Sequence, residues 1–366
     1  MEEVKKLYPL SFLPIGETFA WGGKELGKIY DKEFIECDDQ GKEKTLLKDA
    51  TIAESHEIAD LGYRDSQVRD GWLAGNTISE IMDMYVDRVV GENVFQFFGR
   101  QFPVSVKFID ATGRMPLRVH PNDEIAGERY DFLGKAKLWY VVDAKPEAKL
   151  LLGFKEDASV QDFYTKCLDG SVESMLNTIT PHKGECYVIE PGTVNAAAGG
   201  VTILEVSEAS PMDFCLSNWG AEAPENEFDG ALTIVEAMDF IDYGAYKDQP
   251  VTAGEGAVTK LAKRQEFSAN HIALKDPVHI YAERADSFTI YTCISGAATI
   301  QVPEGSGAVN YQLGAGETLL VPAEVEDFFL VPRQSGTELI EVLVEKSEEA
   351  DGYIDPNAEE KLPEDE

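Results

Sequence analysis

Two side chains that could do chemistry lie two residues apart in the segment MPLRVHPND, residues 115–123. If this segment is a β-strand, Arg118 and His120 point to one face of its sheet, whereas Leu117 and Val119 point to the other. A histidine can bind a metal ion or carry a proton, but an arginine has no free lone pair for a metal. The spacing therefore indicates a site on one face of a strand, and it leaves open whether that site uses a metal.

The elements around this segment are predicted to be mainly β-strands. Short runs rich in β-branched, aromatic and leucine residues, bounded by turn residues, cover 102–111, 137–144, 148–154 and 184–210. Helical periodicity predicts helices over 77–91, 160–180 and 230–244. From about residue 251, closely spaced strands with Gly and Pro turns predict a second β-unit of jelly-roll type.

Composition limits the classes of function. The 366 residues carry a formal net charge of −35, which disfavours non-specific binding to nucleic acids and to anionic membranes. The 5 cysteines are an odd number without a C-x-x-C pair, which favours reduced thiols, and no apolar run is long enough to cross a bilayer. We therefore expect a cytoplasmic protein without nucleic-acid or membrane partners; its oligomeric state stays open.

Several motifs occur in an order that resembles one known family. The segments FPVSVKFIDATGRMPLRVHPNDEIA, GKAKLWYVVDA, VIEPGTVNA and ILEVSEAS are similar to motifs of the class I mannose-6-phosphate isomerases of the compact bacterial type, and the resemblance runs to about Val344. It implies two cupin-like jelly-roll barrels with helical insertions. We expect an N-terminal domain over 1–245 that carries the active-site pocket, a C-terminal domain over 246–345, and a mobile acidic tail over 346–366.

The resemblance also implies a zinc site, and this sequence departs from it. The family uses Gln, His, Glu and His as ligands, and the matching positions here are Arg118, His120, Lys137 and Asn195. Arg and Lys cannot ligate zinc at neutral pH, and each adds positive charge where the ion would lie. We therefore expect no metal at these positions and no cofactor.

The family interconverts mannose 6-phosphate and fructose 6-phosphate by proton transfer, and part of its catalytic set is retained. His120, Lys135 and Glu205 match family residues and are the candidate catalytic groups, whereas Pro211 and Cys215 stand where the family has an Asp and an Arg. Loss of several residues that act together argues against an unchanged reaction. The resemblance thus implies a catalytically degenerate relative or a metal-independent isomerase.

Alternative structural interpretations exist for each candidate. Arg118 and Lys137, with Asn195, could bind a sugar, a sugar phosphate or another anion, or the two cations could pair with Glu205 and other acids and fill the cavity. His120 could be a hydrogen-bonded core residue. Cys215 and Cys186 are expected to be buried, inert thiols, and His56 is expected to serve packing. A structural or interaction protein with a filled cavity therefore remains the third hypothesis.

Overall fold

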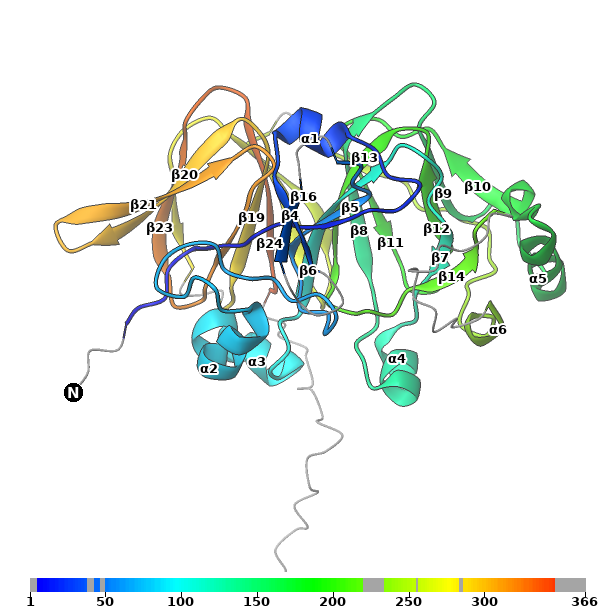
Figure 1. Cartoon of the computed structure of the whole chain (residues 1–366), viewed down its shortest axis with the longest axis horizontal. Coiled ribbons are helices and arrows are strands. Elements are labelled where there is room, and N and C mark those ends of the chain that lie inside the picture. The colour runs from blue at the N-terminus through cyan, green and yellow to red at the C-terminus, as the bar shows by residue number, and fades with distance from the viewer. Residues whose placement is uncertain are drawn as a thin grey trace, which may run out of the picture.

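The computed structural model describes residues 5–37, 43–46, 50–219, 234–254, 256–282 and 286–345, and this part of the chain is mainly β (Figure 1). It forms four sheets, which lie as two facing pairs side by side. The predicted acidic tail at 346–366 lies outside the described residues. The mainly β class predicted from the sequence is confirmed.

The first pair of sheets encloses the candidate site. The larger sheet has nine strands in the order β15 (Val251–Thr252), β11 (Glu185–Ile189), β8 (Lys137–Ala144), β13 (Val201–Glu208), β6 (Val104–Ala111), β5 (Glu54–Ile58), β2 (Ile15–Glu17), β3 (Phe34–Cys37) and β4 (Glu43–Leu46). The smaller has five, in the order β10 (Leu176–Ile179), β9 (Lys149–Phe154), β12 (Asn195–Ala198), β7 (Leu117–Val119) and β14 (Phe214–Ser217). Apolar side chains from both sheets, including Ile109, Trp139 and Leu150, form one core between them.

The second pair comes almost entirely from the C-terminal third. A six-stranded sheet has the order β1 (Leu10–Ser11), β22 (Thr318–Val321), β19 (Thr289–Ser295), β24 (Thr337–Leu343), β17 (Ser268–Leu274) and β16 (Val258–Lys263). It faces a four-stranded sheet of β18 (Val278–Tyr281), β23 (Asp327–Pro332), β20 (Ala297–Glu304) and β21 (Gly307–Gly314). The short N-terminal strand β1 pairs with β22, so the start of the chain is held by the C-terminal sheet.

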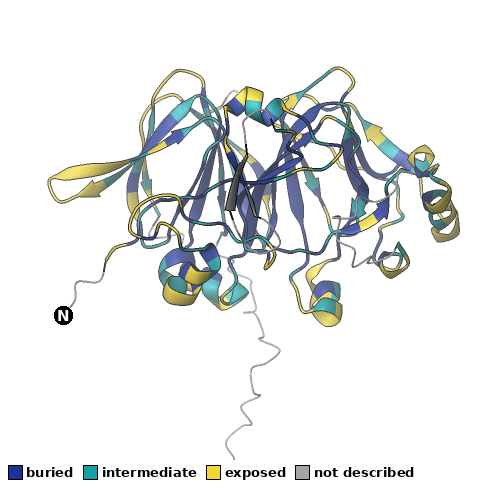
Figure 2. Ribbon diagram, viewed as in Figure 1, coloured by how far each residue is buried: buried dark blue, intermediate teal, exposed yellow. Residues whose placement is uncertain are grey.

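A third core joins the two pairs. Phe108 and Leu204 from the nine-stranded sheet belong to one buried cluster with Ile290 and Val342 from the six-stranded sheet. The central strands are consequently buried on both faces, as their dark colour in Figure 2 shows, whereas the β20–β21 hairpin extends into solvent. Burial on both faces explains the nearly continuous apolar runs of these strands.

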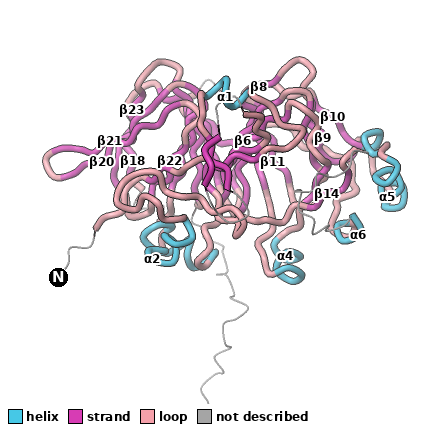
Figure 3. The backbone as a smooth tube through the Cα atoms, viewed as in Figure 1, coloured by secondary structure: helices cyan, strands magenta, loops and turns pink. Residues whose placement is uncertain are grey.

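The helices lie at the periphery of the sheets (Figure 3). They are α1 (Glu25–Tyr30), α2 (Ile78–Val90), α3 (Glu92–Phe98), α4 (Asp123–Tyr130), α5 (Val160–Asp169), the 3-10 helix η1 (Val172–Met175) and α6 (Ile234–Ala237). The prediction over 77–91 is confirmed, because Thr77 and Glu80 form a capping box and Gly91 ends the helix. Each helix in the described ranges is too short or too polar to cross a membrane.

Two predicted helices differ from the structure. The prediction over 160–180 is right for α5 and η1, but Leu176–Ile179 pairs with β9 as strand β10. In the segment 230–244, residues 230–233 lie outside the described part, and α6 ends at Ala237. Apolar spacing alone does not distinguish a helix from a turn whose apolar residues pack on a core, and here Phe240 and Ile241 pack in that way.

Candidate functional site

The alternation of side chains along β7, β8 and β13 builds the candidate site between the nine- and five-stranded sheets. On β7, Leu117 and Val119 belong to a buried apolar cluster that also contains Phe214, so Arg118 points to the opposite face of the sheet. On β8 and β13, Leu138 and Leu204 lie in the third core, which joins the two pairs of sheets. The residues next to them in sequence therefore point to the other face, toward β7 and β12. Those neighbours include Lys137 and Glu205.

Glu205 is paired through both of its carboxylate oxygens. Its Oε1 lies 3.4 Å from Nζ of Lys107, and its Oε2 lies 3.5 Å from Nζ of Lys137. The indole Nε1 of Trp139 donates a 2.6 Å hydrogen bond to Oε2. A carboxylate held by two ammonium groups and an N–H donor is stabilised in its ionised form.

Asp213 gathers the remaining cations. Its Oδ2 lies 3.4 Å from Nη1 of Arg118 and 3.6 Å from Nζ of Lys135, and its Oδ1 lies 3.3 Å from Nε2 of His120. Its side chain is 24% exposed, whereas the side chain of His120 is 2% exposed. Asp213 is thus the acid that solvent reaches most easily among those that contact the predicted site residues.

Glu54 connects these two groups. Its Oε2 accepts a 2.6 Å hydrogen bond from Nζ of Lys107, and its Oε1 accepts a 3.1 Å hydrogen bond from Nη1 of Arg118. Lys107 and Arg118 therefore each contact two acids. We call the following residues the ion network: Glu54, Lys107, Arg118, Lys135, Lys137, Glu205 and Asp213.

Asn195 lies beside the ion network on β12, where it pairs with Arg118 in register. Its side-chain N–H groups donate to the backbone carbonyls of Arg118, at 3.2 Å, and of Thr193, at 2.9 Å. Its Oδ1 is buried and makes no hydrogen bond among the described residues. The structure thus brings together all six residues predicted for the site: Arg118, His120, Lys135, Lys137, Asn195 and Glu205.

The pKa shifts distinguish the two candidate proton carriers, His120 and Glu205. Burial, reinforced by the charge of Lys137, lowers the pKa of His120 well below its ordinary value, so its imidazole is neutral at pH 7. Burial opposes ionisation of Glu205, but Lys107, Lys137 and Lys135 outweigh it and hold the pKa of Glu205 far below its ordinary range. An acid with so low a pKa is a weak base, so His120 is the better candidate for proton transfer.

Lys137 has a different balance. Burial lowers its pKa to about 8, although the charges of Glu205 and Asp213 oppose this shift. The neighbouring cations hold the pKa of Asp213 well below its ordinary value against its own burial, with Lys135 and Arg118 contributing most. The charge of Lys137 can therefore change in a pH range in which its acidic neighbours stay ionised.

The four residues that the resemblance assigns to zinc-ligand positions, Arg118, His120, Lys137 and Asn195, do not fit a zinc ion. The Arg118 guanidinium is hydrogen-bonded to Glu54, and the Lys137 ammonium lies against Glu205, so both groups supply positive charge to acids. The imidazole of His120 and the amide oxygen of Asn195 are the two remaining donors, whereas zinc in proteins normally has three or four protein ligands. A second histidine is absent from these four positions.

Several residues in and beside the ion network are missing from the prediction made from the sequence, or have another role in the structure than the predicted one. Lys107 stands in the middle of a buried strand, and a lysine in such a run is a signal that could have found it. Asp213 follows Pro211 outside any strand, and Pro211 is the residue that matches the family's Asp position. His56 does more than pack: its Nε2 lies between the carboxylates of Glu17 and Glu54.

The cysteine predictions are right in one case and wrong in another. Cys186 is buried, and burial raises the pKa of its thiol, as expected for an inert group. Cys215 is exposed, not buried. It pairs with Arg118 in the β14–β7 register, so its side chain points away from the core face that Phe214 occupies.

Comparisons with known proteins agree with this fold. The chain is 24% identical over 329 residues to the mannose-6-phosphate isomerase ManA of Bacillus subtilis, covering 88% of this chain and 95% of that protein. It is 23% identical over 234 residues to a mannose-6-phosphate isomerase of Streptococcus mutans, covering 62% of this chain and 70% of that protein. No protein-family model matches the chain.

Solved structures show the same fold. The crystal structure of the mannose 6-phosphate isomerase from Bacillus subtilis superposes with a TM-score of 0.73 at 21% identity and covers 92% of this chain and 99% of its own. A variant of phosphomannose isomerase from Salmonella typhimurium superposes with a TM-score of 0.70 at 15% identity and covers 93% and 100%. Taken with the order of the motifs around His120 and Glu205, these similarities support membership of the mannose-6-phosphate isomerase family.

Proposed function

We propose that this protein binds a sugar phosphate in the ion network and has lost the family's zinc site. The observation that carries the proposal is that Arg118 and Lys137, at two of the zinc-ligand positions, hold their charged groups against acids inside the sheet pair. The positive charges of Arg118 and Lys137 would take the place of the charge that a divalent zinc ion supplies in the family. Charge-assisted hydrogen bonds from Arg and Lys are the usual means of binding phosphate groups.

Asp213 supports this proposal because it shows how an anion fits the site. Its carboxylate contacts Arg118, His120 and Lys135 and is partly exposed. A phosphate group that approaches from solvent has the same charge sign and the same kind of acceptor atoms. It would replace Asp213 as the partner of these three groups.

A thermal-unfolding titration tests binding. Ligands that bind the folded state raise the midpoint of unfolding with concentration. We expect mannose 6-phosphate and fructose 6-phosphate to raise it in the presence of a chelator, and mannose without a phosphate to raise it much less. Flat responses to all three would favour the structural alternative, in which the ion network fills the cavity.

A second candidate function is metal-independent isomerisation of the same substrates. It is favoured by His120, whose neutral imidazole lies 3.3 Å from Asp213 and can accept a proton at pH 7. Incorporation of deuterium at C2 of mannose 6-phosphate from heavy water, with a chelator present, tests it directly. Exchange that is lost in His120→Gln supports turnover; absence of exchange with intact binding supports the degenerate relative.

The architecture and location complete the proposal. Each facing pair of sheets is proposed to be a cupin-like jelly roll, with the N-terminal domain at 1–245 and the C-terminal domain at 246–345. A reduced, cytoplasmic location is proposed from the cysteine content. Limited proteolysis, which cleaves between folded domains, tests the boundary near residue 245.

A further inference from the structure

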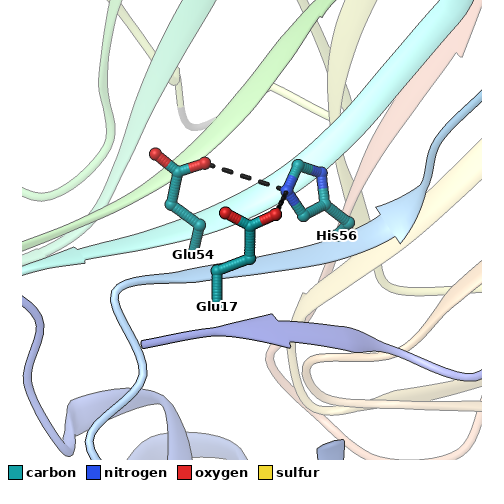
Figure 4. A group of neighbouring side chains, drawn as sticks. All are labelled: Glu17, Glu54 and His56. Atoms are coloured by element: carbon teal, nitrogen blue, oxygen red, sulfur yellow. Dashed lines mark ion pairs between the residues drawn. The ribbon is translucent and has the colours of Figure 1, made fainter. Parts of the chain in front are cut away.

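A second group of potential metal ligands lies beside the ion network, at the neighbouring strands β2 and β5. Glu17, Glu54 and His56 each offer one ligand atom, and these atoms lie within 4.8 Å of one another. In Figure 4 both carboxylates point toward the imidazole ring. From these contacts we propose that Glu17, Glu54 and His56 form a binding site for a divalent transition metal of the zinc class, separate from the positions that the family uses.

Two of the three distances between ligand atoms are close to those around a tetrahedral ion, and the third is at most 4.8 Å. Nε2 of His56 lies 3.4 Å from Oε1 of Glu17 and 3.8 Å from Oε2 of Glu54. With metal–ligand bonds of about 2.1 Å, ligand atoms around a tetrahedral zinc ion lie roughly 3.4 Å apart. One nitrogen and two oxygen ligands leave the fourth position for water or a substrate oxygen, as in catalytic zinc sites.

His56 provides a second, independent observation. Its side chain is 2% exposed, and among the described residues neither ring nitrogen makes a hydrogen bond. Buried polar groups without a hydrogen bond are rare in native proteins, and an ion bound between Nε2 and the two carboxylates would give this nitrogen a ligand bond in its place. Strand alternation places Glu54 and His56 on the same face of β5, and the register of β2 with β5 brings Glu17 opposite Glu54.

The cations around this site are compatible with outer partners of a metal ligand. Arg64 donates to Oε1 of Glu17 at 2.8 Å, and Lys107 donates to Oε2 of Glu54 at 2.6 Å. A carboxylate oxygen has two lone pairs, so it can accept such a hydrogen bond and still bind a metal, and ligating carboxylates are commonly held in this way. These positive charges repel the ion, however, and we expect them to weaken its binding.

Because these cations repel the metal, replacing one of them should strengthen metal binding, and this provides one of the tests. Zn²⁺ binding to chelator-treated, dialysed protein is measured by calorimetry, and Co²⁺ binding by the visible absorption of a tetrahedral site. We expect one equivalent to bind the native chain, His56→Gln to weaken binding at least tenfold, and Arg64→Gln to strengthen it about tenfold. Arg64 is partly exposed, so its replacement leaves the buried contacts of the network in place.

Two control variants locate the metal. His120→Gln removes the retained family ligand, and Glu208→Gln alters the other group of acids that could hold an ion, Asp123, Glu208 and Glu266. We expect both controls to keep the native affinity. The proposal would be overturned if neither the native chain nor Arg64→Gln bound the metal. It would also be overturned if metal binding were lost in either control and kept in His56→Gln.

A metal at Glu17, Glu54 and His56 departs from the expectation, drawn from the sequence, that the chain holds no metal. It goes beyond the proposed function, and its failure is distinguishable from a failure of sugar-phosphate binding. The metal measurements contain no sugar, and the binding of sugar phosphate is measured with a chelator present. A chain that binds mannose 6-phosphate but neither Zn²⁺ nor Co²⁺ would contradict the metal site alone.

Discussion

The ammonium nitrogen of Lys137 lies 3.5 Å from Oε2 of Glu205, with both side chains 2% exposed. The resemblance assigns Lys137 to a zinc-ligand position of the family and Glu205 to one of its acids, and the ion pair between them is buried. Glu205 also has Lys107 and Trp139 as partners, whereas Lys137 has this acid as its one ion-pair partner among the described residues. Loss of either side chain therefore has unequal consequences.

A double-mutant cycle measures this pair. Glu205→Gln leaves Lys137 buried without its acid and is expected to lower the free energy of unfolding by about 3–5 kcal/mol. Lys137→Met leaves Glu205 with two partners and is expected to cost less than about 3 kcal/mol. Urea unfolding of the double variant should show a loss smaller than the sum by about 1 kcal/mol or more. A coupling energy of zero would show that the pair makes no net contribution.

The affinity for sugar phosphate is expected to fall as the pH rises through about 8. Burial lowers the pKa of Lys137 to about 8, so its positive charge is present below that pH and lost above it. The phosphate group of the ligand is almost entirely doubly ionised between pH 7 and 9, because its second pKa is about 6. Titration calorimetry from pH 7 to 9 should show the decrease in the native chain. Lys137→Met should bind more weakly and show no break near pH 8; an unchanged pH profile in this variant would contradict the assignment.

Removal of Asp213 is expected to strengthen anion binding. Asp213→Ala frees Arg118 and Lys135 from a competing carboxylate and should lower the Kd for mannose 6-phosphate roughly tenfold, which is about 1.4 kcal/mol. It should also reduce the stability of the ligand-free protein, because buried cations lose a partner. Asp239→Ala is the matched control, since Asp239 pairs with Arg129 at the surface. Weaker binding in Asp213→Ala would mean that Asp213 contacts the ligand itself.

Glu208 is expected to make stability fall as the pH rises. Burial, together with the charges of Asp123 and Glu266, raises its pKa well above the ordinary value of a glutamate. Between the unfolded and folded pKa values the folded state binds more protons, so stability decreases with increasing pH in that window. Glu208→Gln removes this dependence and keeps an acceptor for the N–H of Ala136.

Urea unfolding at pH 5 and pH 8 checks the prediction for Glu208. The variant should gain stability relative to the native chain as the pH rises from 5 to 8, because it carries no carboxyl group whose folded pKa is raised. Equal pH dependence in both proteins would show that Glu208 is ionised in the folded state.

Local patterns predict the elements and faces of the site, whereas contacts between distant segments are not predictable from them. The faces of Arg118, Lys137 and Glu205 follow from the two-residue period of a strand. The helix at 77–91 is recognisable because its capping box lies within the sequence itself. The proximity of Lys107 to Glu54, by contrast, depends on the register of β5 with β6, which the pattern of either strand does not specify.

Residues outside regular elements are the least predictable. Asp213 lies between β13 and β14, where no periodicity fixes the direction of a side chain. The family motif around Glu205 places its Asp at the position that Pro211 occupies here, two residues before Asp213. The sequence predicts a packing role for His56 because the family has an aromatic side chain there, and the strand pairing that places Glu17 beside it joins segments about forty residues apart.

Titration calorimetry of mannose 6-phosphate into chelator-treated protein tests the central claim most directly. We predict saturable binding of one ligand without metal, binding weakened at least tenfold in Arg118→Met, and little binding of mannose. No heat of binding in the folded, chelator-treated native chain, or binding that appears only after zinc is restored and disappears in His120→Gln, would contradict it.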